Sequence, residues 1–163
     1  MRSHHVDSGH TIGARAARTR ASIVVLDSSP VSLLAMAGVL DSQGYSCVCA
    51  RDRAAAVGAL AMGTQDLMVA DVGDDAAEVL ATLDQMRSVA SYEMLPAVLI
   101  AESRWAGLEK KAEAMKQATR CLFKPIDPNA LIAVVDQVLW MPSLVDAHRR
   151  RGSSPGRTGW VTL

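Results

Sequence analysis

The stretch DLMVADVGDD (residues 66–75) places a carboxylate, Asp71, directly after the apolar run 67–70. A short, continuous apolar run bounded by polar residues is typical of a strand that is buried on both faces of a parallel sheet. A charged carboxylate at the end of such a strand is costly to bury unless it is paired. Asp71 is therefore the first candidate for a functional residue.

The same order, an apolar run followed by a helical pattern, recurs along the chain. The other apolar runs predict strands over 23–26, 45–50, 97–101 and 120–123. Helices are predicted from Pro30 to a stop signal at Gly44, over 54–62, after Asp75, from Trp105 through Met115, and over about 127–140. Five strand-helix units in strict alternation predict an α/β fold, with a five-stranded parallel sheet and helices on both faces.

Two of the predicted helices carry clear start signals. Asp52 is placed to cap the helix over 54–62. Asp75 followed by Glu78 has the form of a capping box, in which the first side chain accepts a hydrogen bond from a backbone N–H in the first turn. These signals support the predicted alternation of strands and helices.

Four residues are predicted to meet at one edge of the sheet. Asp27, Asp71, Ala101 and Lys124 all lie at or just past the ends of predicted strands. In open parallel sheets, ligands bind at the carboxyl ends of the strands. We therefore expect a functional site at this edge, with two carboxylates and one ammonium group.

Four motifs in this order resemble those of the receiver domain of bacterial two-component response regulators, the CheY-like family. The motifs are IVVLDSSP (23–30), DLMVADVG (66–73), LPAVLIAE (95–102) and LFKP (122–125). The resemblance covers about residues 21–141. It implies a flavodoxin-like (βα)5 sandwich of three layers, with 21–141 as the receiver domain.

The resemblance also implies a site. Asp71 would accept a phosphoryl group from the phosphohistidine of a histidine kinase or phosphotransfer protein. Asp27, Asp71 and the backbone carbonyl of Gly73 would bind Mg²⁺, with Ser28 as a further candidate ligand. Oxygen ligands of this kind suit Mg²⁺, which neutralises charge on the approaching phosphoryl group.

The LFKP motif adds a second part to the implied site. Lys124 would pair with the carboxylate at rest and with the phosphoryl oxygens afterwards. The resemblance implies that Lys124 and Pro125 are joined by a cis peptide bond and that both interact with the phosphate.

Three positions depart from the family's usual pattern. Ser28 stands where a second acidic residue is usual, and losing a carboxylate beside a divalent ion removes about 2 kcal/mol of attraction. Mg²⁺ binding is therefore expected to be weak. Ala101 stands where the family has a Thr or Ser that bonds the phosphoryl group, and Cys121 replaces the aromatic switch residue. These two switch positions are thus degenerate.

Charge divides unevenly along a chain whose formal net charge is zero. Residues 1–20 and 143–163 each carry four arginines against one aspartate, and the central part is acidic. We interpret 1–20 and 142–163 as a disordered and a flexible basic tail. An acidic body does not resemble a nucleic-acid interface, whose basic face lies on the folded part.

Other features of the composition narrow the cellular setting. The chain has three cysteines, Cys47, Cys49 and Cys121, and they are not spaced as in a zinc site. We therefore predict that they are buried free thiols. No apolar run is long enough to span a bilayer, and the N-terminus lacks the hydrophobic core of a secretory signal. These observations predict a cytoplasmic protein with no membrane contact.

Two functional hypotheses from different classes remain open. The first is a single-domain response regulator that is phosphorylated on Asp71 and signals by contact with a downstream protein, with a homodimer through its helix four to helix five face as a further option. The second is a pseudo-receiver, an interaction module that works without phosphorylation. An enzyme acting on small molecules is not expected, because the predicted site offers no base beside a nucleophile other than the carboxylates. Rival α/β folds are disfavoured because the motifs of nucleotide-binding folds and of nucleophile elbows are missing from the sequence.

Overall fold

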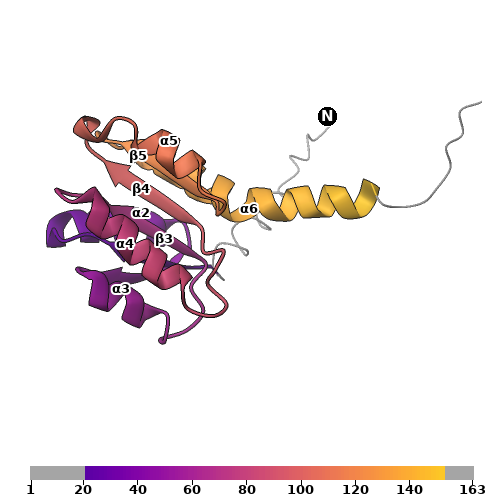
Figure 1. The fold of residues 1–163 in the computed structure, drawn as a ribbon, viewed down its shortest axis with the longest axis horizontal. Helices are drawn as coiled ribbons and strands as arrows, with labels where there is room; N and C mark the ends of the chain where they lie inside the picture. The colour runs from indigo at the N-terminus through magenta and orange to yellow at the C-terminus, as the bar shows by residue number, and fades with distance from the viewer. Residues whose placement is uncertain (1–20, 153–163) are drawn as a thin grey trace, which may run out of the picture.

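A computed structural model describes residues 21–152 of the chain. Within this range, parallel strands form one five-stranded sheet in the order β2-β1-β3-β4-β5 (Figure 1). The strands are β1 (Ser22–Leu26), β2 (Ser46–Ala50), β3 (Leu67–Asp71), β4 (Ala97–Ala101) and β5 (Thr119–Phe123). The predicted five-stranded parallel sheet is confirmed.

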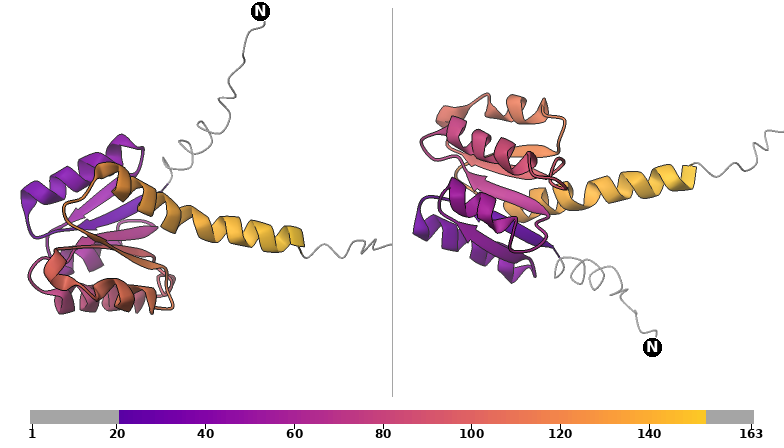
Figure 2. Two further views of the ribbon diagram at one scale, coloured as in Figure 1. Left: turned by 90° about the horizontal axis from the view of Figure 1, so that it is seen from above. Right: turned by 60° about the horizontal axis from the view of Figure 1, so that its bottom comes forward.

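Helices cover both faces of the sheet. They are α2 (Pro30–Ser42), α3 (Arg53–Ala59), α4 (Ala76–Arg87), the 3₁₀ turn η1 (Ser103–Trp105), α5 (Leu108–Glu113) and α6 (Pro128–Gly152). The core cluster on one face includes residues of α2 and α6, and the cluster on the other face includes residues of α3, α4 and α5. Figure 2 shows the resulting three layers, which the CheY-like fold predicts.

The central strand β3 is buried along its whole length. Successive side chains of a strand point to opposite faces, and those of Leu67 and Val69 pack on the α2 and α6 side while those of Met68 and Ala70 pack on the other. The alternation carries Asp71, the last residue of the strand, to the side of α2 and α6. Its side chain therefore lies at the carboxyl edge of the sheet, on the face that α2 and α6 cover.

Both predicted helix caps are present. Asp52 Oδ1 accepts a hydrogen bond from the Ala55 backbone N–H at 2.8 Å, and Asp75 Oδ1 accepts one from the Glu78 N–H at 3.0 Å. The second half of the capping box is absent from these contacts, because the Glu78 carboxylate pairs with Arg53 of α3 through two hydrogen bonds of 2.9 and 2.7 Å. This pair connects the N-terminal turns of α3 and α4.

The single helix predicted from Trp105 onward is wrong. The chain instead forms η1 and then α5, separated by Gly107 with φ of 102°. Such a left-handed backbone is open to glycine at no steric cost, and it interrupts the helical path. As a result, Trp105 is held apart from the axis of α5.

The last helix is longer than predicted. The sequence predicts its end at about Trp140 and a flexible tail over 142–163, whereas α6 continues to Gly152 and extends beyond the sheet (Figures 1 and 2). Pro142 removes one backbone hydrogen bond inside α6, but no glycine interrupts the helix before Gly152, and the good helix formers Leu, Ala and Arg follow the proline. The predictions for 1–20 and 153–163 lie outside the described residues.

The prediction of buried thiols is wrong for Cys49. Its side chain is exposed, and those of Cys47 and Cys121 are half-buried, although all three are free. Cys47 and Cys49 lie on β2, which is an edge strand of the sheet. An edge strand is covered less completely than the central β3, which explains the exposure of Cys49.

A buried arginine ties α4 to the far end of the sheet. Arg87 is 7% exposed, and its Nε and Nη2 donate to the Leu95 carbonyl at 3.0 and 2.8 Å. Nη2 also donates to Thr119 Oγ1 on β5 at 2.9 Å. Burial lowers the pKa of Arg87 from its usual value, an effect that Asp84 partly opposes. The guanidinium therefore depends on these acceptors for its hydrogen bonds.

We predict that Arg87→Ala destabilises the fold by about 2–3 kcal/mol, because it leaves buried acceptors without their donor. Urea denaturation measures this change. The matched control is Arg53→Ala, which removes a partly exposed ion pair and is expected to cost less than about 1 kcal/mol. Equal losses in the two variants would contradict the structural role given to Arg87.

Candidate functional site

The expected carboxylate and ammonium groups meet at the carboxyl edge of the sheet. Lys124, which follows β5, places its Nζ 2.6 Å from Asp71 Oδ2 at the end of β3. The pKa of Lys124 is raised, first by its hydrogen bond with Asp71, and also by the charges of Asp71, Asp27 and Glu102, while burial opposes the shift. The pair therefore joins two strands that are separated in the sheet by β4.

Asp71 is buried but has partners for both carboxylate oxygens. Oδ1 accepts a hydrogen bond from the Gly73 backbone N–H at 2.8 Å, and Oδ2 faces the Lys124 ammonium. The residue is 8% exposed. The carboxylate is therefore held at the carboxyl edge of the sheet by one backbone donor and one ammonium group.

Asp27 occupies the corresponding end of β1. Its Oδ1 accepts a hydrogen bond from the Ser29 N–H at 2.8 Å, whereas Oδ2 is buried and has no hydrogen-bond partner among the described residues. Asp27 does not cap α2, because Ser29 Oγ accepts from the Ser32 N–H at 3.4 Å and is the cap. A buried carboxylate oxygen without a donor is unfavourable, so the position is suited to a cation.

The oxygen atoms here fit a divalent cation in part. Asp27 and Asp71 offer carboxylate oxygens, which are the ligands that Mg²⁺ prefers. The other assigned ligand, the Gly73 carbonyl, already accepts hydrogen bonds from Trp105 Nε1 at 3.0 Å and from Arg104 Nη2 at 3.2 Å. Ser28 is exposed. Among residues 21–140, whose side chains the structure describes, no three His, Cys, Asp or Glu side chains group as a metal site, so Asp27 and Asp71 are the acidic part of the set.

The sequence interpretation missed Arg104, the residue that forms the rim of this site. Its guanidinium pairs with the Asp74 carboxylate, and its Nε lies 3.2 Å from Glu102 Oε2. It also lies over the Trp105 ring, 5.5 Å from the centroid. The pKa of Arg104 is raised, chiefly by the hydrogen bond with Asp74. Two acidic residues just past adjacent strands were the available signal for a cationic partner.

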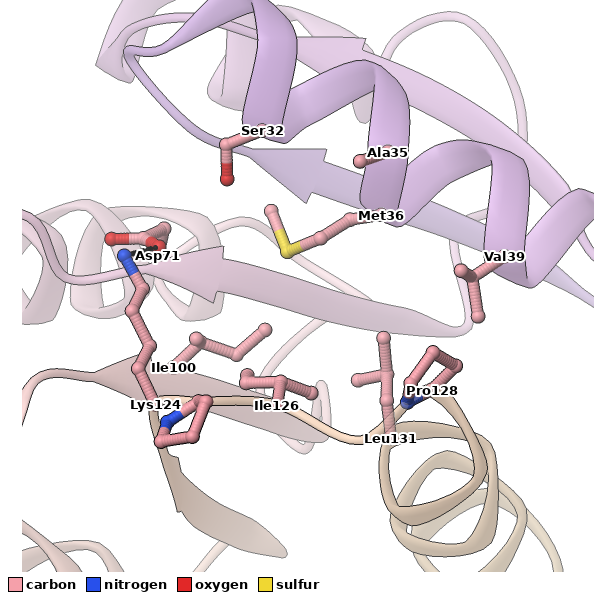
Figure 3. Close-up of a pocket in the computed structure, with 11 residues that line it drawn as sticks. Ser32, Ala35, Met36, Val39, Asp71, Ile100, Lys124, Ile126, Pro128 and Leu131 are labelled. Carbon is pink, nitrogen blue, oxygen red and sulfur yellow. Dashed lines mark ion pairs between the residues drawn. The ribbon is translucent and has the colours of Figure 1, made fainter.

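A pocket of about 380 Å³ extends from the Asp71–Lys124 pair along α2 (Figure 3). Asp71 and Lys124 lie at one end of the pocket, where the Ser32 hydroxyl faces the carboxylate. Met36 projects into the middle, and the other end is apolar, with Leu131 of α6. The pocket beside Asp71 is thus bordered by α2 on one side and by the segment from Lys124 to Leu131 on the other.

The two degenerate switch positions, Ala101 and Cys121, carry neither the hydroxyl nor the aromatic ring that the receiver pattern has there. Ala101 is buried at the end of β4 and has no hydroxyl. Cys121 on β5 is half-buried, and burial raises the pKa of its thiol to about 11. It stays protonated near neutral pH. The expected cis bond between Lys124 and Pro125 is present, and Pro125 lines the pocket beside Lys124.

Known structures of receiver domains share the fold of this chain. The chemotaxis protein CheY4 of Vibrio cholerae superposes with a TM-score of 0.65 at 19% identity, covering 73% of this chain and 98% of that one. A receiver domain protein from Clostridium thermocellum gives 0.66 at 13% identity, covering 77% and 98%. A response regulator receiver protein from Sinorhizobium medicae gives 0.61 at 23% identity, covering 73% and 94%. No protein-family model and no curated protein sequence matches the chain.

These likenesses define the class of fold. The sheet order, the three layers and the solved structures show that the chain has the CheY-like receiver fold. Among the described residues, no helix is long and apolar enough to cross a membrane. At these identities the comparison defines the fold alone, and the chemistry of the site is argued from its own residues.

We predict that Asp71 and Lys124 are coupled in the free energy of unfolding. Lys124→Met should destabilise the fold more in the wild-type background than beside Asp71→Asn, with a coupling of about 1 kcal/mol for a pair that is partly exposed. A double-mutant cycle in urea measures it. Because folding raises the pKa of Lys124, the ion pair contributes its full stabilisation at pH values below 10.5, the pKa in the unfolded chain. This stabilisation is lost as the pH rises through the higher pKa of the folded state. A coupling that persists unchanged well above that pH would contradict the ion pair.

Proposed function

We propose that the chain is a response-regulator-type signalling protein in which Asp71 accepts a phosphoryl group from the phosphohistidine of a histidine kinase or phosphotransfer protein. The observation that carries the proposal is the pairing of a buried Asp71 carboxylate with Lys124, beside the unpartnered Oδ2 of Asp27. A carboxylate, a mobile ammonium and an acidic pocket at one sheet edge are the groups that this transfer needs.

In the proposed reaction, an Asp71 carboxylate oxygen attacks phosphorus while the bond from phosphorus to the imidazole nitrogen breaks. The imidazole leaves with the bonding electron pair, and an acyl phosphate remains on Asp71. Lys124 then moves from the carboxylate to the phosphoryl oxygens, which its flexible side chain and exposed position allow. The Gly73 N–H orients the carboxylate by its hydrogen bond to Oδ1.

Asp27 and Asp71 would hold a divalent cation, which when bound supplies positive charge to offset the charge of the phosphoryl oxygens. Weak affinity is proposed, because Ser28 replaces a carboxylate and the Gly73 carbonyl already has two donors. Mg²⁺ is the proposed cation on the basis of the oxygen ligands.

The partner that carries the phosphohistidine is proposed to approach along α2. Val31 and Leu34 on this helix are 80% and 69% exposed, although both are apolar. They lie on the helix that borders the pocket containing Asp71. Exposed apolar side chains next to a reactive group favour a protein partner over a small solute. Cytoplasmic location and output by contact with a downstream protein, or by a dimer through α5 and α6, complete the proposal.

The alternative is a pseudo-receiver, in which Asp71 and Lys124 are structural and a partner binds without phosphate. Ala101 and Cys121 favour it, because neither can follow a phosphoryl group as a hydroxyl or an aromatic ring would. A partner that binds equally well with and without a beryllofluoride mimic of the phosphoryl group would support this alternative. Binding that strengthens with the mimic would reject it.

We predict that incubation with acetyl phosphate and Mg²⁺ adds one phosphoryl group to the wild-type chain, and that Asp71→Asn abolishes the addition. Intact-mass spectrometry measures the change. The matched control is Asp75→Asn, which alters a nearby acidic residue that caps α4 and should retain the addition. Folded protein that gains no phosphoryl group, or equal gain in Asp71→Asn, would overturn the proposed role of Asp71.

A further inference from the structure

Two side chains from η1 bind the backbone carbonyl of Gly73. Trp105 Nε1 donates to it at 3.0 Å and Arg104 Nη2 at 3.2 Å. A carbonyl oxygen has two lone pairs, so these donors use its accepting capacity. We infer that Arg104 and Trp105 compete with the divalent cation for the Gly73 carbonyl, and that they thereby limit the affinity of the cation for the Asp27 and Asp71 pocket.

Both donors are held in place by other contacts. The Arg104 guanidinium pairs with Asp74 and Glu102 and lies over the Trp105 ring. Trp105 is half-buried and packs against the core cluster on the α4 side of the sheet. The turn at Gly107 separates η1 from α5 and leaves η1 facing the β3–α4 loop. The donors are therefore preorganised on the carbonyl, which favours this arrangement over hydration.

Charge acts in the same direction as the hydrogen bonds. Arg104 brings a guanidinium to the carbonyl that a cation would use, and like charges at contact distance repel. The pocket supplies the carboxylates of Asp27 and Asp71, with Ser28 at the position of a third. A cation that ligates the Gly73 carbonyl must therefore displace two donors and approach a positive group.

The competition has a consequence for signalling. Thermodynamic linkage acts in both directions. The cation binds more tightly when the Trp105 and Arg104 donors are absent, and cation binding in turn releases these donors from the Gly73 carbonyl. The release would move η1, next to a groove of about 350 Å³ that includes Leu80 and Lys111. Cation binding would thus change the surface at η1, although Ala101 has no hydroxyl and Cys121 has no aromatic ring to transmit the change.

The test is the Mg²⁺ affinity of the full chain, measured by isothermal titration calorimetry for the wild type, Trp105→Phe and Arg104→Gln. Trp105→Phe keeps an aromatic ring and removes only the donor, and it should tighten binding about 3- to 10-fold, the range of one net hydrogen bond. Arg104→Gln removes a charge as well and should tighten binding at least as much. Arg53→Gln, which makes the same charge change without contacting Gly73, should stay within about twofold of the wild type.

Tryptophan emission supplies a second readout. Mg²⁺ should change the emission of the wild type with the midpoint found by calorimetry, and the change should vanish in Trp105→Phe. Binding that is detected only in Trp105→Phe or Arg104→Gln would also support the inference. Wild-type affinity in both variants, or no Mg²⁺ binding in any variant, would overturn it. Lower stability in urea with unchanged affinity would assign Trp105 a structural role alone.

This inference shares with the proposed function only the cation pocket of Asp27 and Asp71. The competition at the Gly73 carbonyl and the acceptor role of Asp71 can therefore fail separately. Acetyl phosphate incorporation is measured on the same wild-type samples. Incorporation at Asp71 together with unchanged Mg²⁺ affinity in the variants rejects the competition and keeps the acceptor. Tighter Mg²⁺ binding in the variants without incorporation keeps the competition and rejects the acceptor.

Discussion

The ion pair between Asp71 and Lys124 is the interaction on which the site depends. It joins the end of β3 to the segment after β5, across β4, and its carboxylate is almost fully buried. A buried carboxylate is unfavourable without a partner, so the segments that carry Asp71 and Lys124 must hold the two side chains together. The Gly73 N–H adds a fixed donor to the same carboxylate. The rest of the edge is arranged around this requirement.

Around the ion pair, the site keeps a second buried carboxylate, Asp27, but lacks three side chains of the usual receiver pattern. Asp27 contributes a buried oxygen with no donor among the described residues. Ser28 supplies no carboxylate, Ala101 no hydroxyl and Cys121 no aromatic ring. Arg104 and Trp105 instead form a cationic and aromatic rim bound to Gly73. The Arg104 guanidinium thus offsets the negative charge of Asp74 and Glu102 beside the pocket. A more acidic pocket would depend on a bound metal ion for the same compensation.

Most of the fold could be predicted because its elements are encoded locally. The apolar run before Asp71 predicts a buried strand, and Asp52 and Asp75 form the predicted caps through contacts within one helical turn. The length of α6 was underestimated, since the prediction relied on burial and this segment continues beyond the sheet. Local pattern was a good guide to the buried strands and to the two helix caps.

The rim of the site could not be predicted in the same way. Trp105 and Gly73 are far apart in sequence, and their contact depends on the left-handed backbone at Gly107, which separates η1 from α5. A helical pattern through Trp105 gave no sign of that break. The carboxylates and Lys124 were found because strand ends of a parallel sheet share one edge, a rule that does not extend to the loops beyond them.

The most direct test of the account is to locate the phosphoryl group chemically. Borohydride reduces an acyl phosphate on aspartate to homoserine, so peptide mass spectrometry after treatment with phosphodonor and Mg²⁺ identifies the modified residue. The account predicts homoserine at position 71, dependent on the phosphodonor. Homoserine at another carboxylate, or none in folded protein, would contradict the claim that Asp71 is a phosphoryl acceptor.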